Sequence, residues 1–214
     1  MEIITRKTFF QSDEFADTFI CDMQNSYSVD LDESIRSDKK QLKQNFDHRQ
    51  QFNQNNSPVT GNCVIVYPAI NRKDYCLKLP ESITLFLKTL GSQKVTLLDF
   101  VNTDFSDFPF ETFQKRNIFK RISRGIKRSY VIQFSVDIIV DIFPLFFFSR
   151  RYDIPVILMI SDGEVPVSLR LCDDGNLHLN FREKHHEQVI AAATVAGFVI
   201  GDIELCRGYS VSFL

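Results

Sequence analysis

Two stretches of this 214-residue chain repeat the same order of expected elements, and this recurrence constrains the fold more than any other feature. In residues 62–100, and again in residues 165–205, the apolar pattern predicts strand, strand, helix and strand. Both predicted helices end at a glycine, Gly91 and Gly197, because glycine adopts the left-handed conformation of a helix C-cap at little cost. The copies share little residue identity, so the recurrence is either a duplication or a chance repeat of a common α+β unit.

The expected elements of the two units can be set side by side. In the first unit, strands over 63–67 and 75–79 precede a helix over 80–90 and a strand over 95–100. In the second unit, strands over 165–171 and 177–181 precede a helix over 183–196 and a strand over 198–205. Asp-Gly pairs at 162–163 and 174–175 predict hairpin turns. We therefore predict an α+β fold with mixed, largely antiparallel sheets and packed helices, containing two similar β-β-α-β units.

The rest of the chain predicts further elements and one boundary. A strand over 2–10 precedes a helix that Ser12 caps and that ends near Asn25. Later segments predict a helix over 110–128, a strand over 129–136, a buried strand pair or core segment over 136–148, and strands over 154–160 and 209–214. The tract 50–57, rich in Gln and Asn, predicts a loop. We place a boundary there, between an N-terminal strand, helix and polar arm (1–57) and an α+β globular region (58–214).

Composition and motifs exclude several classes of function. The five cysteines contain no CxxC pair and the N-terminus carries no export signal, which predicts a cytoplasmic protein with reduced thiols. The most apolar run, 136–148, is too short to cross a bilayer, so we expect no membrane partner. The chain has no glycine-rich phosphate loop and no nucleophile elbow. We therefore predict no catalytic residue and lean against an enzyme.

Two clusters in the last module are candidates for chemistry. Thiols and imidazoles are zinc ligands, and five of them occur here: Cys172, His178, His185, His186 and Cys206. The usual short ligand pairs are missing, and adjacent histidines point to different sides of a helix, so we predict no metal and no cofactor. Arg182, His185 and Glu187 resemble the acid/base sets of ribonucleases. Residues at a helix start more commonly serve capping and solvation.

Charge is segregated along a chain that is nearly neutral overall. The predicted helix over 115–128 and the polar side of the predicted hairpin are candidate binding surfaces; their residues are Lys115, Arg116, Lys120, Arg121, Arg124, Lys127, Arg128, Arg170, His178, Asn180 and Arg182. Basic side chains beside aromatic ones can face phosphates or dock on an acidic protein. They can also form a solvated face that the chain's own acidic segments neutralise.

These observations favour a non-enzymatic module that binds another protein. A cytoplasmic α+β chain with a polar arm and segregated charge resembles, in general style and without a shared motif, the immunity proteins that bacteria keep against their own toxins. That resemblance implies an inhibitor that neutralises a toxin or an enzyme by direct binding. One alternative is a protein or enzyme that acts on nucleic acid or nucleotides through the basic helix. Another is a structural subunit of a larger assembly.

Overall fold

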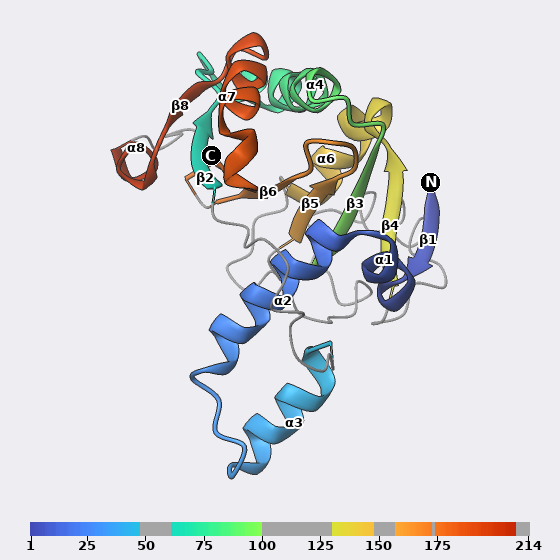
Figure 1. Cartoon of the computed structure of the whole chain (residues 1–214). Coiled ribbons are helices and arrows are strands. Elements are labelled where there is room, and N and C mark those ends of the chain that lie inside the picture. The colour runs from blue at the N-terminus through green and yellow to red at the C-terminus, as the bar shows by residue number, and fades with distance from the viewer. Residues whose placement is uncertain (48–60, 100–129, 148–156, 173, 209–214) are drawn as a thin grey trace.

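A single sheet organises the described part of the chain. The computed structural model describes residues 1–47, 61–99, 130–147, 157–172 and 174–208 (Figure 1). Their eight strands form one sheet in the order β1-β4-β3-β5-β6-β7-β2-β8, and every neighbouring pair is antiparallel. In chain order the strands are β1 Glu2–Thr5, β2 Gly61–Val66, β3 Lys94–Asp99, β4 Tyr130–Ser135, β5 Ile157–Ser161, β6 Val167–Leu171, β7 Leu177–Phe181 and β8 Val199–Gly201. The predicted α+β class is confirmed.

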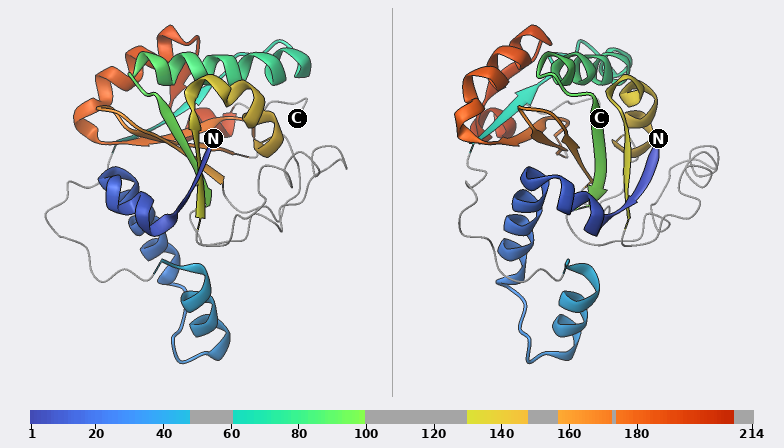
Figure 2. Two further views of the ribbon diagram at one scale, coloured as in Figure 1. Left: turned by 90° about the vertical axis from the view of Figure 1, so that its right-hand side faces the viewer. Right: turned by 45° about the vertical axis from the view of Figure 1, so that its right-hand side comes forward.

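The larger core lies on one face of this sheet. Helices α4 (Arg72–Thr89), α6 (Ile139–Phe147) and α7 (His186–Val195) cover that face (Figure 2). Side chains alternate between faces along a strand, so Leu177, Leu179 and Phe181 of β7 all enter this core while His178 and Asn180 point to the other face. The predicted core side of the hairpin is therefore confirmed.

Helices cover the opposite face only in part. Helices α1 (Arg6–Ser12) and α2 (Glu14–Ser28) bury Phe9, Phe15 and Ile20 against β3, β4 and β5. The short helix α8 (Ile203–Gly208) buries Cys206 against β2. Helix α3 (Arg36–Asn45) lies beyond the far end of α2, away from the sheet (Figure 1). Between α2 and α8 the polar side of β6 and β7 forms the floor of a hollow.

The first predicted unit is wrong at its second strand. Residues 75–79 are helical and belong to α4, which Asn71 caps by accepting a hydrogen bond from the Asp74 backbone N–H. Buried side chains recur at three- and four-residue spacing through the whole helix, at Tyr75, Leu79, Ile83, Phe86 and Leu87. Pro80 lies inside this helix and does not begin it. The first unit is therefore β-α-β, so the two units do not share one pattern.

Three other boundaries differ from expectation. The strand predicted over 2–10 ends at Thr5, whose side chain caps α1, and the cap of α2 is Asp13 because Ser12 closes α1. The segment predicted as a buried strand pair or core segment forms a 3₁₀ turn (Val136–Ile138) followed by α6, and it contributes Val136, Ile139 and Phe143 to the larger core, so it is a core segment and not a strand pair. The strand predicted over 198–205 stops at Gly201, and α8 follows it.

Several predictions fall outside the described residues. These are the polar tract 50–57 with its boundary near Ser57, the basic helix over 110–128 and the last strand over 209–214. The proposed division at residue 57 stays a prediction. The described N-terminal elements share the sheet with the rest of the chain, since β1 pairs with β4.

Candidate functional site

Polar side chains from neighbouring strands gather on the half-covered face of the sheet. Register places Arg170 of β6 opposite His178 of β7, and Asn180 of β7 opposite Asn62 of β2. Cross-strand neighbours on one face lie close enough to act together. The structure therefore brings together three of the predicted binding residues, Arg170, His178 and Asn180.

These residues line a hollow of about 290 Å³ with mixed walls. Phe19 and Met23 of α2 and Leu158 of β5 supply apolar walls, and Asp202, which precedes α8, adds a carboxylate to the lining. Arg170 is half-buried, and within the described residues it forms no ion pair with a carboxylate. The hollow thus combines apolar surface with the Arg170 guanidinium and the Asp202 carboxylate, which form no ion pair with each other.

The other predicted binding residues lie elsewhere. Arg182 donates to the Glu14 carboxylate at 3.2 Å, which ties the end of β7 to the start of α2. The basic set Lys115, Arg116, Lys120, Arg121, Arg124, Lys127 and Arg128 lies outside the described residues. Their role in binding stays a prediction.

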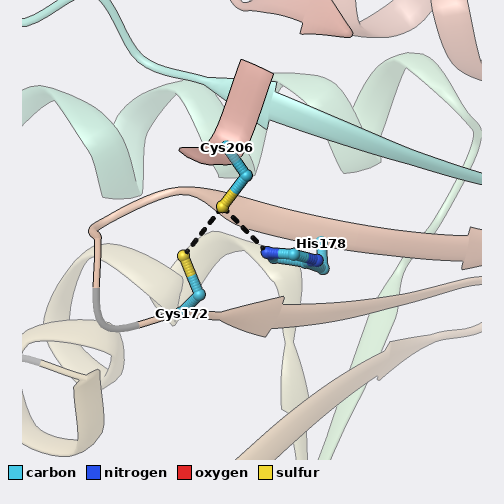
Figure 3. A group of neighbouring side chains, drawn as sticks. All are labelled: Cys172, His178 and Cys206. Carbon is cyan, nitrogen blue, oxygen red and sulfur yellow. Dashed lines mark hydrogen bonds between the residues drawn. The ribbon is translucent and has the colours of Figure 1, made fainter. Parts of the chain in front are cut away.

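A cluster of two thiols and an imidazole lies beside the hollow. The sulfur atoms of Cys172 and Cys206 are 3.6 Å apart, and Nε2 of His178 is 3.2 Å from the Cys206 sulfur (Figure 3). All three potential ligand atoms lie within 4.8 Å of one another. His178 belongs both to this cluster and to the lining of the hollow.

Local structure holds each member of the cluster in place. Cys172 and His178 flank the β6–β7 turn, in which the Cys172 backbone N–H donates to the Asn176 carbonyl at 2.9 Å and Gly175 has a φ of 84°. The Tyr75 hydroxyl of α4 donates to the Gly175 carbonyl at 2.6 Å. Cys206 is presented by α8, whose first turn donates backbone N–H groups to Asp202 Oδ1. The β6–β7 hairpin and helix α8 therefore bring the three side chains to one point.

The surroundings shift the pKa values of the two half-buried members, Cys172 and His178. Burial raises the pKa of Cys172 to about 11, against the lowering effect of the backbone N–H groups of Asn176 and Asp174. Burial, with help from the Arg170 charge, lowers the pKa of His178, so its ring is neutral near pH 7. Both shifts favour the uncharged form of the group, the thiol of Cys172 and the neutral ring of His178.

The other two histidines in the described part of the chain, His185 and His186, do not join the cluster. His185 Nδ1 lies 2.8 Å from Gln188 Oε1, and the His186 ring packs on Phe181 with 5.8 Å between ring centroids. Because Arg182 pairs with Glu14, the acid/base set proposed from the sequence does not converge on one point among the described residues. Of the five candidate zinc ligands, the structure brings together Cys172, His178 and Cys206.

Sequence reasoning missed this convergence for a specific reason. A hairpin places Cys172 and His178 close together, and that signal was available. Cys206 follows 28 residues after His178 and comes just after the strand expected over 198–205, so no spacing rule connected it. No helix among the described residues is long and apolar enough to span a membrane. The chain matches no protein-family model, no curated protein and no solved structure.

Proposed function

We propose that this chain is a non-enzymatic, cytoplasmic protein-binding module that neutralises a partner, such as a toxin or an enzyme, by covering part of its surface. The observation that supports it is the half-buried Arg170 in the hollow between α2 and α8, where no described carboxylate pairs with it. A partly desolvated guanidinium is most favourable when it meets a carboxylate, because charge-assisted hydrogen bonds strengthen as water is excluded. The hollow is suited to an acidic side chain from another protein.

The walls of the hollow support the same partner chemistry. Phe19, Met23 and Leu158 offer apolar contact around Arg170, and Asn180 adds an amide. Specific interfaces combine a few apolar or aromatic anchors with a small number of polar groups that fix orientation. We therefore expect the partner to insert an acidic residue flanked by apolar ones.

Charge reversal in the hollow tests the proposal. The partner is first captured from native lysate by the tagged chain at low and high salt, identified, and purified. Its affinity for Arg170→Glu is then measured by calorimetry and should fall by roughly thirtyfold or more, about 2 kcal/mol. Lys73→Glu, the same change of charge type on the exposed side of α4, is the control and should bind normally. An unchanged affinity of Arg170→Glu would remove the hollow from the interface.

The basic segment over 115–128 is the second predicted contact. Reversal of both Arg121 and Arg124 to Glu should weaken the same complex if that segment touches the partner. The nucleic-acid alternative predicts a different result, namely retained nucleic acid that is lost at high salt, because phosphate contacts release counterions. Self-association of the purified chain at micromolar concentration would instead favour the structural-subunit alternative.

A further inference from the structure

We infer that Cys172, His178 and Cys206 form a binding site for a zinc ion beside the hollow between α2 and α8 (Figure 3). The inference goes beyond the proposed function and does not depend on any protein partner. It revises the expectation of no metal, which rested on missing short ligand pairs. In the fold, the β6–β7 hairpin and the short helix α8 bring the three ligands together although no short sequence spacing connects them.

The separations between the ligand atoms match those of a tetrahedral zinc site. With bonds of about 2.3 Å to sulfur and about 2.0 Å to nitrogen, two sulfurs lie about 3.8 Å apart and a sulfur and a nitrogen about 3.5 Å apart. The observed separations are 3.6 Å between the sulfurs and 3.2 Å between the Cys206 sulfur and the His178 nitrogen. The third pair, the Cys172 sulfur and a His178 ring nitrogen, lies within 4.8 Å, so it would have to close by up to about an ångström to reach the tetrahedral spacing.

The groups around the sulfurs suit thiolate ligands. The Asn176 side-chain amide lies 3.6 Å from the Cys206 sulfur, as a donor to it. Backbone N–H groups of Asn176 and Asp174 donate to the Cys172 sulfur. Donors aimed at ligand atoms are the usual outer shell of a metal site.

The His178 imidazole distinguishes this cluster, as a zinc site, from a pair of thiols that could only form a disulfide. A disulfide needs its sulfurs at about 2.05 Å and uses no histidine. Here a ring nitrogen of His178 lies 3.2 Å from the Cys206 sulfur and completes the cluster, and imidazole is a common metal ligand. Two thiolates and one imidazole are a known set for zinc, with a fourth position for water or another ligand. Binding releases both thiol protons to solvent, which leaves the two thiolate charges to balance the ion.

Zinc titration of the full chain tests the inference. The purified, reduced protein is titrated with Zn²⁺ against a chromophoric chelator, and one ion per chain is expected. Cys172→Ser and His178→Asn should each weaken binding by at least about tenfold. Cys21→Ser and His186→Asn change the same residue types outside the cluster and should bind as the unmodified chain does. Cobalt in place of zinc should give a thiolate-to-cobalt charge-transfer band that Cys172→Ser loses.

A second measurement needs no variant and so does not depend on whether a variant folds. Alkylation of each thiol in the unmodified chain is followed by peptide mass spectrometry, with and without Zn²⁺. Zinc should slow alkylation of Cys172 and Cys206 but leave the half-buried Cys21 and Cys76 unchanged. The inference is overturned if the reduced chain takes up no zinc, or if zinc protects the four thiols equally.

Discussion

Asp13 caps helix α2 while bearing a charge that its surroundings disfavour. Its carboxylate accepts a hydrogen bond from the Ala16 backbone N–H at 2.9 Å. Burial raises the pKa of Asp13 above its ordinary 3.8, although N–H donors and Arg182 act in the other direction. The folded chain therefore holds this proton more tightly than the unfolded chain, so stability falls as pH rises from 3.8 to the folded value. Above that window the full penalty is present.

The variant Asp13→Asn separates the cap from the charge. Asparagine caps a helix as well as aspartate does, so the hydrogen bond to Ala16 survives while the charge is removed. We expect Asp13→Asn to equal or exceed the unmodified chain in free energy of unfolding at pH 7. Asp13→Ala loses the cap and should fall about 1 kcal/mol below Asp13→Asn. Urea denaturation at pH 7 measures both, and an Asn variant clearly less stable than the unmodified chain would contradict this account.

Local patterns in the sequence predicted part of the candidate site. Strand alternation was enough to place Arg170, His178 and Asn180 on one face, because a two-residue period is a local property of the chain. Cys206 could not be assigned in this way. Its position depends on Gly201 ending β8 and on Asp202 starting α8, and on packing against Val64 and Val66 of a strand far away in sequence.

The β6–β7 hairpin depends on α4 for its fixed turn. The Tyr75 hydroxyl, fully buried, donates to the Gly175 carbonyl at 2.6 Å. Tyr75→Phe removes this bond and leaves the carbonyl buried with one partner fewer, which should cost about 1–2 kcal/mol in free energy of unfolding. Tyr67→Phe is the control, since the Tyr67 hydroxyl forms no hydrogen bond within the described residues.

Chemical denaturation and amide hydrogen exchange measure the effect of Tyr75→Phe. Beyond the loss in stability, exchange at Cys172 and Gly175 should become faster, because both amides lie in the turn that Tyr75 supports. Unchanged exchange at these two amides, with Tyr75→Phe as stable as Tyr67→Phe, would show that the turn holds its shape without α4.

Helix α4 also shows which elements local patterns can predict. Strands β2, β3 and β7 were predicted from β-branched and apolar alternation, and the structure confirms them. The segment 75–79 was misread because Pro80 is typical of the first turn of a helix, which made the preceding residues look separate. Packing decides the matter: Tyr75 and Leu79 extend the buried stripe of α4 by more than a turn, which offsets the hydrogen bond that proline cannot make.

A buried ionic network joins the N-terminal elements to the sheet. Arg6 of α1 donates to the Asp47 carboxylate from Nε at 3.0 Å and from Nη2 at 2.7 Å. Its Nη1 donates to the Asp99 carbonyl at the end of β3, at 2.7 Å. The side-chain amide of Gln24 in α2 donates to the Asp47 carboxylate at 2.9 Å. The Arg6 and Asp47 side chains are only 3% and 14% exposed, so the network connects four parts of the chain in a largely desolvated setting.

The two single variants of this pair should together lose more stability than the double variant does, because each leaves one buried charge without its partner. Arg6→Met leaves the Asp47 charge uncompensated and should cost about 3–5 kcal/mol. Asp47→Asn leaves Arg6 without its counter-charge, but the double variant has neither charge and should recover part of the loss. A double-mutant cycle in urea denaturation measures this coupling. Lys78→Met at the exposed pair with Glu81 is the control and should change stability little, because solvent screens that pair. Strictly additive losses at Arg6 and Asp47 would mean that the network does not act as a unit in holding the N-terminal elements to the sheet.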